Sequence, residues 1–145
     1  MGVTRFSGPV YGAKCVLLSV SKETISSGGG NGLSTTIGKT IVPAYEDWYI
    51  TEFTGSRASS GSTSHGISLD DDGSVLSSIT FNSSTPEANT LNTLTPAGDE
   101  YEGVRVAGGS TLSVFVGCSS AVSASSGITA SVRGYIRWVA SSRAF

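Results

Sequence analysis

The stretch Ile128-Thr-Ala-Ser-Val-Arg-Gly-Tyr-Ile-Arg-Trp-Val139 decides the fold, because apolar and polar side chains alternate along it. Successive side chains of a β-strand point to opposite faces of a sheet. One face would carry Ile128, Ala130, Val132, Gly134, Ile136 and Trp138. The other face would carry Thr129, Ser131, Arg133, Tyr135 and Arg137. The stretch therefore predicts a long strand with one face on a core and one polar face.

Shorter runs of strand-like sequence lie upstream, separated by turns rich in Gly, Ser and Pro. They cover residues 13–20, 37–42, 48–54, 67–69, 75–81, 103–107 and 112–118. In the run 13–20, we expect Val16, Leu18 and Val20 to point inward. The Asp72-Gly73 pair predicts a tight hairpin between its flanking runs.

Two further local structures follow from the pattern. The Ser-rich link 119–127 would join the runs 112–118 and 128–139 as a second hairpin. Thr85 and Pro86 would begin a short helical turn, as cap and first helical residue. Ala88, Leu91 and Leu94 would then share one face of that turn.

Composition favours strands over helices. Serine, threonine and glycine together number 61 of the 145 residues, and these residues disfavour helices. A hydrophobic content of 38% argues against disorder. We therefore predict an all-β protein: a jelly-roll or related Greek-key β-sandwich of about eight strands. One such domain would span residues 13–145, and residues 1–12 would form an extended N-terminal arm.

The arm has apolar anchors but no core of its own. Three glycines and Pro9 favour extended, flexible backbone. Phe6, Val10 and Tyr11 are residues that a purely disordered tail tends to lack. A segment of this kind usually lies on another surface.

The segment Thr4–Val10, TRFSGPV, resembles the opening of small proteins encoded beside the major capsid protein in tailed-phage genomes. Pro96–Gly98 and Gly134–Ile136 are similar to the last turn and strand of trimeric jelly-roll domains. The resemblance to these capsid decoration, or cement, proteins implies a homotrimer that binds the major capsid protein on the capsid exterior. Such a protein is made in the host cytoplasm and stabilises the shell by bridging neighbouring capsomers.

This hypothesis places the binding residues on two segments. From the arm they are Arg5, Phe6, Pro9, Val10 and Tyr11. From the polar face of the last strand they are Arg133, Tyr135 and Arg137, because Arg and Tyr are favoured at interfaces. An ordinary solvated strand face is the alternative for the second set.

Charge is distributed unevenly along the chain. Residues 44–102 hold ten of the eleven acidic residues and one basic residue, whereas the flanks hold eight basic residues and one acidic residue. If the chain ends pair in one sheet, the molecule would have a basic and an acidic side; scattered surface charge is the alternative. A net charge of −2 excludes a general nucleic-acid binder, and no apolar stretch reaches membrane-spanning length or forms a signal peptide.

Catalysis and metal binding are not expected, and no cofactor is implied. His65 is the single histidine and follows a Ser/Gly-rich stretch that would not hold a general base in place. With one histidine, Cys15 and Cys118 cannot complete a metal site, so each should be a small buried residue, a disulfide being the alternative. Asp70–Asp72 fits a hairpin tip better than a calcium loop.

Two other functions remain open. The chain would instead be a tail-associated or carbohydrate-binding jelly-roll module if Trp48, Tyr49, Arg57 and His65 formed a ligand surface. A glycoside hydrolase would need an organised carboxylate pair, for which Glu46, Asp47 and Glu52 are the candidates.

Overall fold

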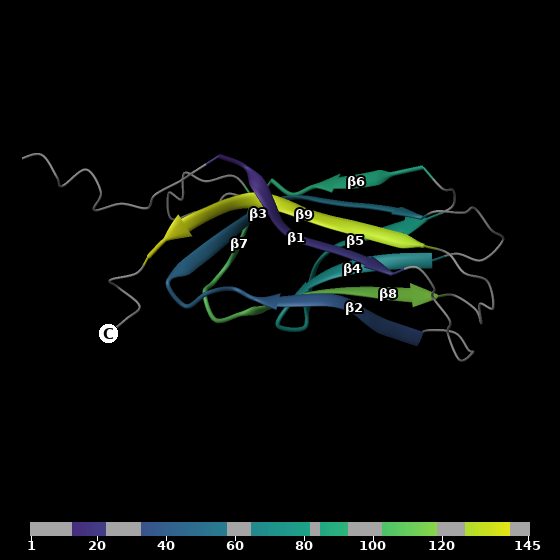
Figure 1. The fold of residues 1–145 in the computed structure, drawn as a ribbon, viewed down its shortest axis with the longest axis horizontal. Helices are drawn as coiled ribbons and strands as arrows, with labels where there is room; N and C mark the ends of the chain where they lie inside the picture. Colours follow the sequence, from purple (N-terminus) through teal and green to yellow (C-terminus); the bar gives the residue numbers. More distant parts are fainter. Residues whose placement is uncertain are drawn as a thin grey trace, which may run out of the picture.

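The computed structural model describes residues 13–22, 33–57, 65–81, 85–92, 103–118 and 127–139. These residues form nine strands (Figure 1): β1 (Cys15–Lys22), β2 (Leu33–Ile41), β3 (Glu46–Arg57), β4 (His65–Asp71), β5 (Ser74–Phe81), β6 (Glu87–Thr90), β7 (Val104–Val106), β8 (Thr111–Cys118) and β9 (Ile128–Trp138). Within the same ranges the structure contains no helix that could cross a membrane.

The strands form two antiparallel sheets that pack face to face. Sheet I has the order β1-β9-β3-β6, with β7 also paired to β3, and sheet II has the order β2-β8-β4-β5. The pairing is nested, because β1 pairs with β9, β2 with β8, β3 with β6 and β7, and β4 with β5. A chain rolled up in this nested way is a jelly roll, and the predicted fold class is confirmed.

The core lies between the inner faces of the two sheets. It consists of Val42, Trp48, Ile50, Phe53, Ile67, Leu69, Ile79, Phe81, Leu91, Val106, Leu112, Val114, Val116, Ile128, Ala130 and Val132. In β9 burial alternates as the sequence predicts from Ile128 to Gly134, but not at the end of the strand, where Trp138 is exposed. Each large apolar side chain that is fully buried here stabilises the fold by about 1.5–3 kcal/mol.

The predicted hairpin at Asp72-Gly73 is confirmed as the turn between β4 and β5. Asp72 has φ 48° and Gly73 has φ 91°, so both turn residues are left-handed, as a two-residue type I′ turn requires. The turn is also tied to β8. The Thr111 amide donates to the Asp72 carboxylate at 2.8 Å, and the Asp72 amide donates to the Thr111 carbonyl at 3.0 Å.

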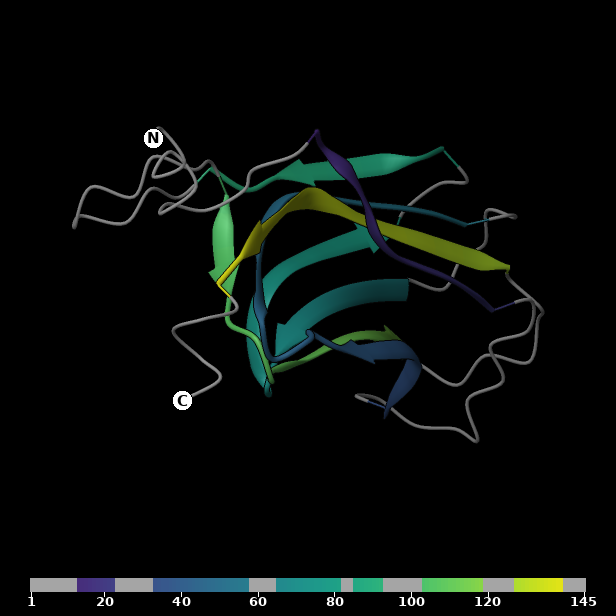
Figure 2. The ribbon, with the colours of Figure 1, turned by 60° about the vertical axis from the view of Figure 1, so that its left-hand side comes forward.

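The second predicted hairpin is wrong, because β8 and β9 belong to different sheets. Figure 2 shows green β8 and yellow β9 in separate layers. Each strand has one apolar face, and the two faces bury against the core from opposite sides instead of lying in one surface. Alternation within a strand does not reveal which sheet the strand joins.

The predicted helical turn is also wrong, because residues 87–90 form the extended strand β6, which pairs with β3. Ala88 lies opposite Thr54 and is exposed, whereas Leu91 enters the core. Pairing with β3 supplies backbone hydrogen bonds and buries Leu91, which outweighs the weak local preference for a helix. Leu94 lies outside the described residues.

Contacts join the sheets along both lateral edges. At one edge β1 crosses close to β2, where a Cβ on Gly38 would lie 2.1 Å from Val20 Cγ1, so any larger residue would displace the Val20 side chain. At the other edge the Asn89 side chain of β6 donates to Ser77 Oγ at 3.1 Å and to the Ser78 carbonyl of β5. The broad outer faces of the two sheets are therefore the main surfaces offered by the strands.

The two cysteines lie in different sheets. Cys15 is a free, half-buried thiol at the start of β1, and Cys118 ends β8. Pairing places Cys15 opposite Gly134 of β9 and Cys118 opposite Leu33 and His65. Cys15 is thus in a strand as expected, but only partly buried.

Candidate functional site

The outer face of sheet I gathers the residues that the sequence places on the polar side of β9. Arg133 is exposed there, and Tyr135 and Arg137 are half-buried. Their spacing of two residues puts them in one line along the strand. The neighbouring strands β1, β3 and β7 determine what lies beside this line.

A hydrogen-bonded cluster holds this part of the face together. Arg137 Nη1 donates to Tyr49 Oη at 2.9 Å, which links β9 to β3. Arg105 of β7 donates to Asp47 Oδ2 through Nε at 3.1 Å and Nη2 at 2.9 Å, and the Gly108 amide donates to Asp47 Oδ1 at 3.2 Å. Asp47 is fully buried, and a buried charge needs a partner. The Arg105 guanidinium, which is 47% exposed, provides the compensating charge.

An apolar side chain extends the cluster onto the edge strand. Val16 of β1 lies opposite Arg133 and is 55% exposed. The expectation that Val16 points inward is wrong, because the register with β9 shifts between Val16 and Leu18. Leu18 and Val20 do pack against the core. We call Val16, Arg105, Arg133, Tyr135 and Arg137 the basic patch.

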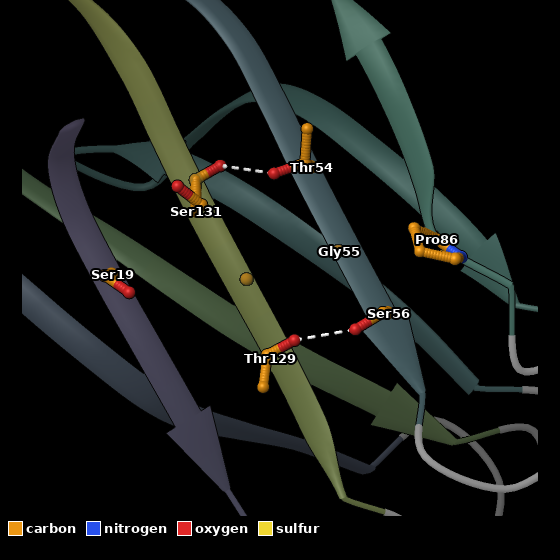
Figure 3. A pocket seen from close by; sticks show the side chains of 8 residues that line it. Ser19, Thr54, Gly55, Ser56, Pro86, Thr129 and Ser131 are labelled. Atoms are coloured by element: carbon orange, nitrogen blue, oxygen red, sulfur yellow. Dashed lines mark hydrogen bonds between the residues drawn. The ribbon is translucent and has the colours of Figure 1, made fainter. Parts of the chain in front are cut away.

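The other half of the same face is uncharged. It contains a shallow depression of about 230 Å³, which we call the hydroxyl groove (Figure 3). The groove is lined by Ser19 of β1, Thr129 and Ser131 of β9, Thr54 and Ser56 of β3, and Pro86. Two hydrogen bonds fix its floor. Thr54 Oγ1 donates to the Ser131 carbonyl at 3.4 Å, and the Ser56 and Thr129 hydroxyls lie 2.7 Å apart. A hydroxyl can both donate and accept, so the groove can bind neutral polar groups.

The alternative ligand residues do not form one surface. Trp48 is 7% exposed in the core, where its Nε1 donates to Glu46 Oε1 at 2.9 Å. Arg57 is buried at the end of the same strand, and Tyr49 lies on the outer side of sheet I but is only 1% exposed. His65 begins β4 in sheet II. The ring of Trp48 is therefore not available to a ligand at the surface.

Charges do not separate into a basic and an acidic side. The chain ends do pair, since β1 lies beside β9. However, β9 also pairs with β3, which places Glu52 opposite Arg133 and Asp47 opposite Arg137. The prediction of two oppositely charged sides is therefore wrong for sheet I, where acids and bases alternate across neighbouring strands.

The acidic hairpin tip shows no metal geometry. Among the described residues no group of three acidic, histidine or cysteine side chains could hold a metal ion. Burial raises the pKa of Asp71, the charge of Asp72 raises it further, and a hydrogen bond with the Ser110 side chain lowers it.

Sequence reasoning missed an exposed aromatic pair. Alternation placed Trp138 on the inner face, but its ring stacks on Tyr45 with centroids 5.5 Å apart and planes 10° apart. Both rings are about half exposed. It also missed Val16 and Arg105, because their places beside β9 and β3 follow from long-range pairing that no local motif encodes.

The predicted arm residues Arg5, Phe6, Pro9, Val10 and Tyr11 lie outside the described residues, as does the turn Pro96–Gly98. The described chain begins at Ala13, two residues before β1, whose first residue Cys15 pairs with Gly134. Ala13, to which the predicted arm would be joined, is therefore beside the basic patch.

No protein-family model matches the chain, and no curated protein sequence matches it. Among solved structures, chains of infectious bursal disease virus are similar to 92% of this chain. The Gx strain gives a TM-score of 0.42 at 11% identity, and the Gt strain gives 0.44 at 9% identity. This chain spans 32% of the length of those viral chains.

A third similar structure is the CBM36-1 domain of a multidomain xylanase from the hindgut metagenome of Trinervitermes trinervoides. It has a TM-score of 0.35 and 12% identity, over 86% of this chain and 95% of that domain. The assignment to the jelly rolls rests on the nested strand pairing itself.

Proposed function

We propose that this protein is a structural component of a tailed-phage virion that binds the outside of the assembled capsid and stabilises it. It would contact the major capsid protein and bridge neighbouring capsomers. The resemblance of residues 4–10 to capsid decoration proteins supports this proposal, and a jelly-roll domain that needs no catalytic residue agrees with it.

One observation carries the proposal: Ala13, which follows the proposed arm in the sequence, lies just before β1 beside the basic patch. Arm residues 1–12 lead into β1, and Val16 of that strand lies exposed next to Arg133. An arm at residues 1–12 would therefore begin beside the patch, and the two could contact one partner together. Once either part is bound, the other acts at high effective concentration, so the two bind more tightly together than apart.

The closed edges of the sandwich favour docking through faces. Because contacts join β1 to β2 and β5 to β6, adding a capsid strand to an edge would require breaking them. A homotrimer, as the resemblance implies, would present three arms at once and multiply the affinity again. Binding to the assembled shell alone would stabilise that shell by mass action.

Co-sedimentation of the purified protein with capsids of its own phage, before and after shell expansion, tests the proposal. We expect saturable binding to expanded shells at a simple ratio to the capsid subunit. Deleting residues 2–12 should abolish binding while the truncated protein keeps a cooperative thermal transition. Absence of binding to both kinds of shell would refute the function, and full binding by the truncated protein would refute the role of the arm.

The carbohydrate-binding or tail-associated alternative has less support. Its proposed surface needed Trp48, Tyr49 and Arg57 at the exterior, and all three are buried. The aromatic pair Tyr45–Trp138 is the exposed stacking surface that the described residues leave for this alternative.

A further inference from the structure

The outer faces of the two sheets differ in charge. On sheet I, Arg133 is exposed and Arg105 is about half exposed, whereas Asp47 is fully buried beneath Arg105 and Glu52 is half-buried. The described side chains of that face therefore offer mainly guanidinium groups to a partner. On sheet II the corresponding row holds exposed Lys39 and half-buried Asp70 on either side of Ser113, and the described side chains of that face include no guanidinium group.

Guanidinium groups select the chemistry of the partner. Arginine presents a planar fork of donors that matches a carboxylate, and such charge-assisted hydrogen bonds are stronger than neutral ones. Val16 and Tyr135 flank Arg133 and add apolar contact area. A complementary surface would therefore carry carboxylates around an apolar contact.

The hydroxyl groove continues the same surface. Ser131 lies two residues from Arg133 on the same face of β9, a distance of about 7 Å along the strand. The small side chains in Figure 3 keep the floor of the groove low, and the residues lining it carry no charge. A partner backbone could therefore approach closely and pair its amide and carbonyl groups with the hydroxyls.

We propose that the outer face of sheet I lies on the capsid, with the basic patch on an acidic surface of the major capsid protein. An extended, uncharged segment of that protein then occupies the hydroxyl groove. The inference rests on the proposed function and adds to it the docking face and the chemistry of its partner. The outer face of sheet II points away from the shell.

Two variants test the face, each with a matched control on sheet II. Arg133→Glu reverses an exposed charge of the basic patch, and Lys39→Glu makes the same reversal on sheet II. Thr129→Trp fills the groove at an exposed position, and Thr80→Trp places the same bulk on β5. All four variants should keep a thermal transition close to that of the parent, because the substituted side chains are exposed.

Co-sedimentation with expanded capsids at low and high salt is the measurement. We expect Arg133→Glu to weaken binding about tenfold or more and to reduce its salt dependence, because like charges then face each other. Thr129→Trp should weaken binding about tenfold at both salt concentrations, because the bulk prevents close approach. The two sheet II variants should bind like the parent.

Other outcomes separate this inference from the proposed function. If the parent protein does not bind capsids, the proposed function fails. If the parent binds and all four variants bind equally well, or if only the sheet II variants weaken, the assigned docking face is wrong. A further outcome concerns the groove alone. If gels containing neutral xylan or dextran retard the parent but not Thr129→Trp, the groove binds a glycan, and the proposal that a capsid segment occupies it is wrong.

Discussion

At the scale of single residues, the surroundings of Asp71 in the β4–β5 hairpin disfavour the charged form of its carboxyl group. Burial raises the pKa of its carboxyl, and the neighbouring charge of Asp72 adds to the shift. A raised pKa means that the folded state binds the proton more tightly than the unfolded chain does. The stabilisation from neutral Asp71 is therefore complete below the ordinary aspartate pKa and is lost as the pH rises through the higher folded value.

Replacing Asp71 by Asn should consequently stabilise the protein at neutral pH. The gain should be less than about 1 kcal/mol, because the side chain is only partly buried and solvent screens its charge. Thermal melts of parent and variant at pH 7 and at pH 3 measure it. The difference should vanish at pH 3, where both side chains are neutral; an equal gain at both pH values would point to packing instead of charge.

At the scale of elements, an irregularity in β3 requires glycine on both neighbouring segments. The register of β3 against β9 shifts between Ile50 and Glu52, which makes Thr51 an extra residue in the strand. A Cβ on Gly134 would lie 1.9 Å from the Tyr49 carbonyl oxygen. Gly103, with φ 99°, would place its Cβ 2.3 Å from the Ile50 carbonyl oxygen. Because Gly134 lies this close to the β3 backbone, β9 and β3 are held together beside the Arg137–Tyr49 hydrogen bond.

Gly134→Ala should therefore destabilise the fold by about 3 kcal/mol or more, because backbone must move to admit the methyl group. Gly66→Ala in β4 is the matched control, since its Cβ would meet the Ile79 carbonyl oxygen at an ordinary 3.4 Å. Urea unfolding of both variants measures the free energies. Equal losses of stability would contradict the role assigned to the contact at Gly134.

The strands were largely predictable because their signals are local. Alternation located β9 and β8, and Asp72-Gly73 located the hairpin, since each depends on residues adjacent in sequence. The placement of β8 and β9 in different sheets was not predictable in this way. It depends on pairings between segments far apart in the chain, such as β2 with β8.

The candidate site was predictable only along one strand. Spacing put Arg133, Tyr135 and Arg137 on one face, and the structure agrees. Trp48 and Tyr49 are adjacent aromatics, so alternation sends them to opposite faces without saying which one faces the core, and both are buried. The register shift after Val16 places that residue beside Arg133, and the pairing of β7 with β3 places Arg105 beside Tyr49. Neither arrangement is marked by a sequence motif.

At the scale of the whole molecule, nested pairing brings both ends of the described chain to one end of sheet I. Cys15 lies opposite Gly134, four residues before the last residue of β9, so Ala13 and Val139 flank the same part of the sheet. The basic patch, and Ala13 to which the proposed arm would be joined, consequently belong to a rigid sandwich whose edges are joined by contacts. A rigid body that binds two neighbouring capsomers would resist their separation.

The proposed stabilisation of the shell therefore predicts a concentration-dependent rise in the temperature at which expanded capsids disrupt. A ligand that binds only the intact shell stabilises each site by about 1.4 kcal/mol for every tenfold increase in free protein above the dissociation constant. Calorimetry of capsids with increasing amounts of the protein measures this rise. The Arg133→Glu variant and the protein lacking residues 2–12 should give a smaller rise at the same concentration. Saturable binding by the parent that leaves the disruption temperature unchanged would mean that the protein coats the shell without bridging its capsomers.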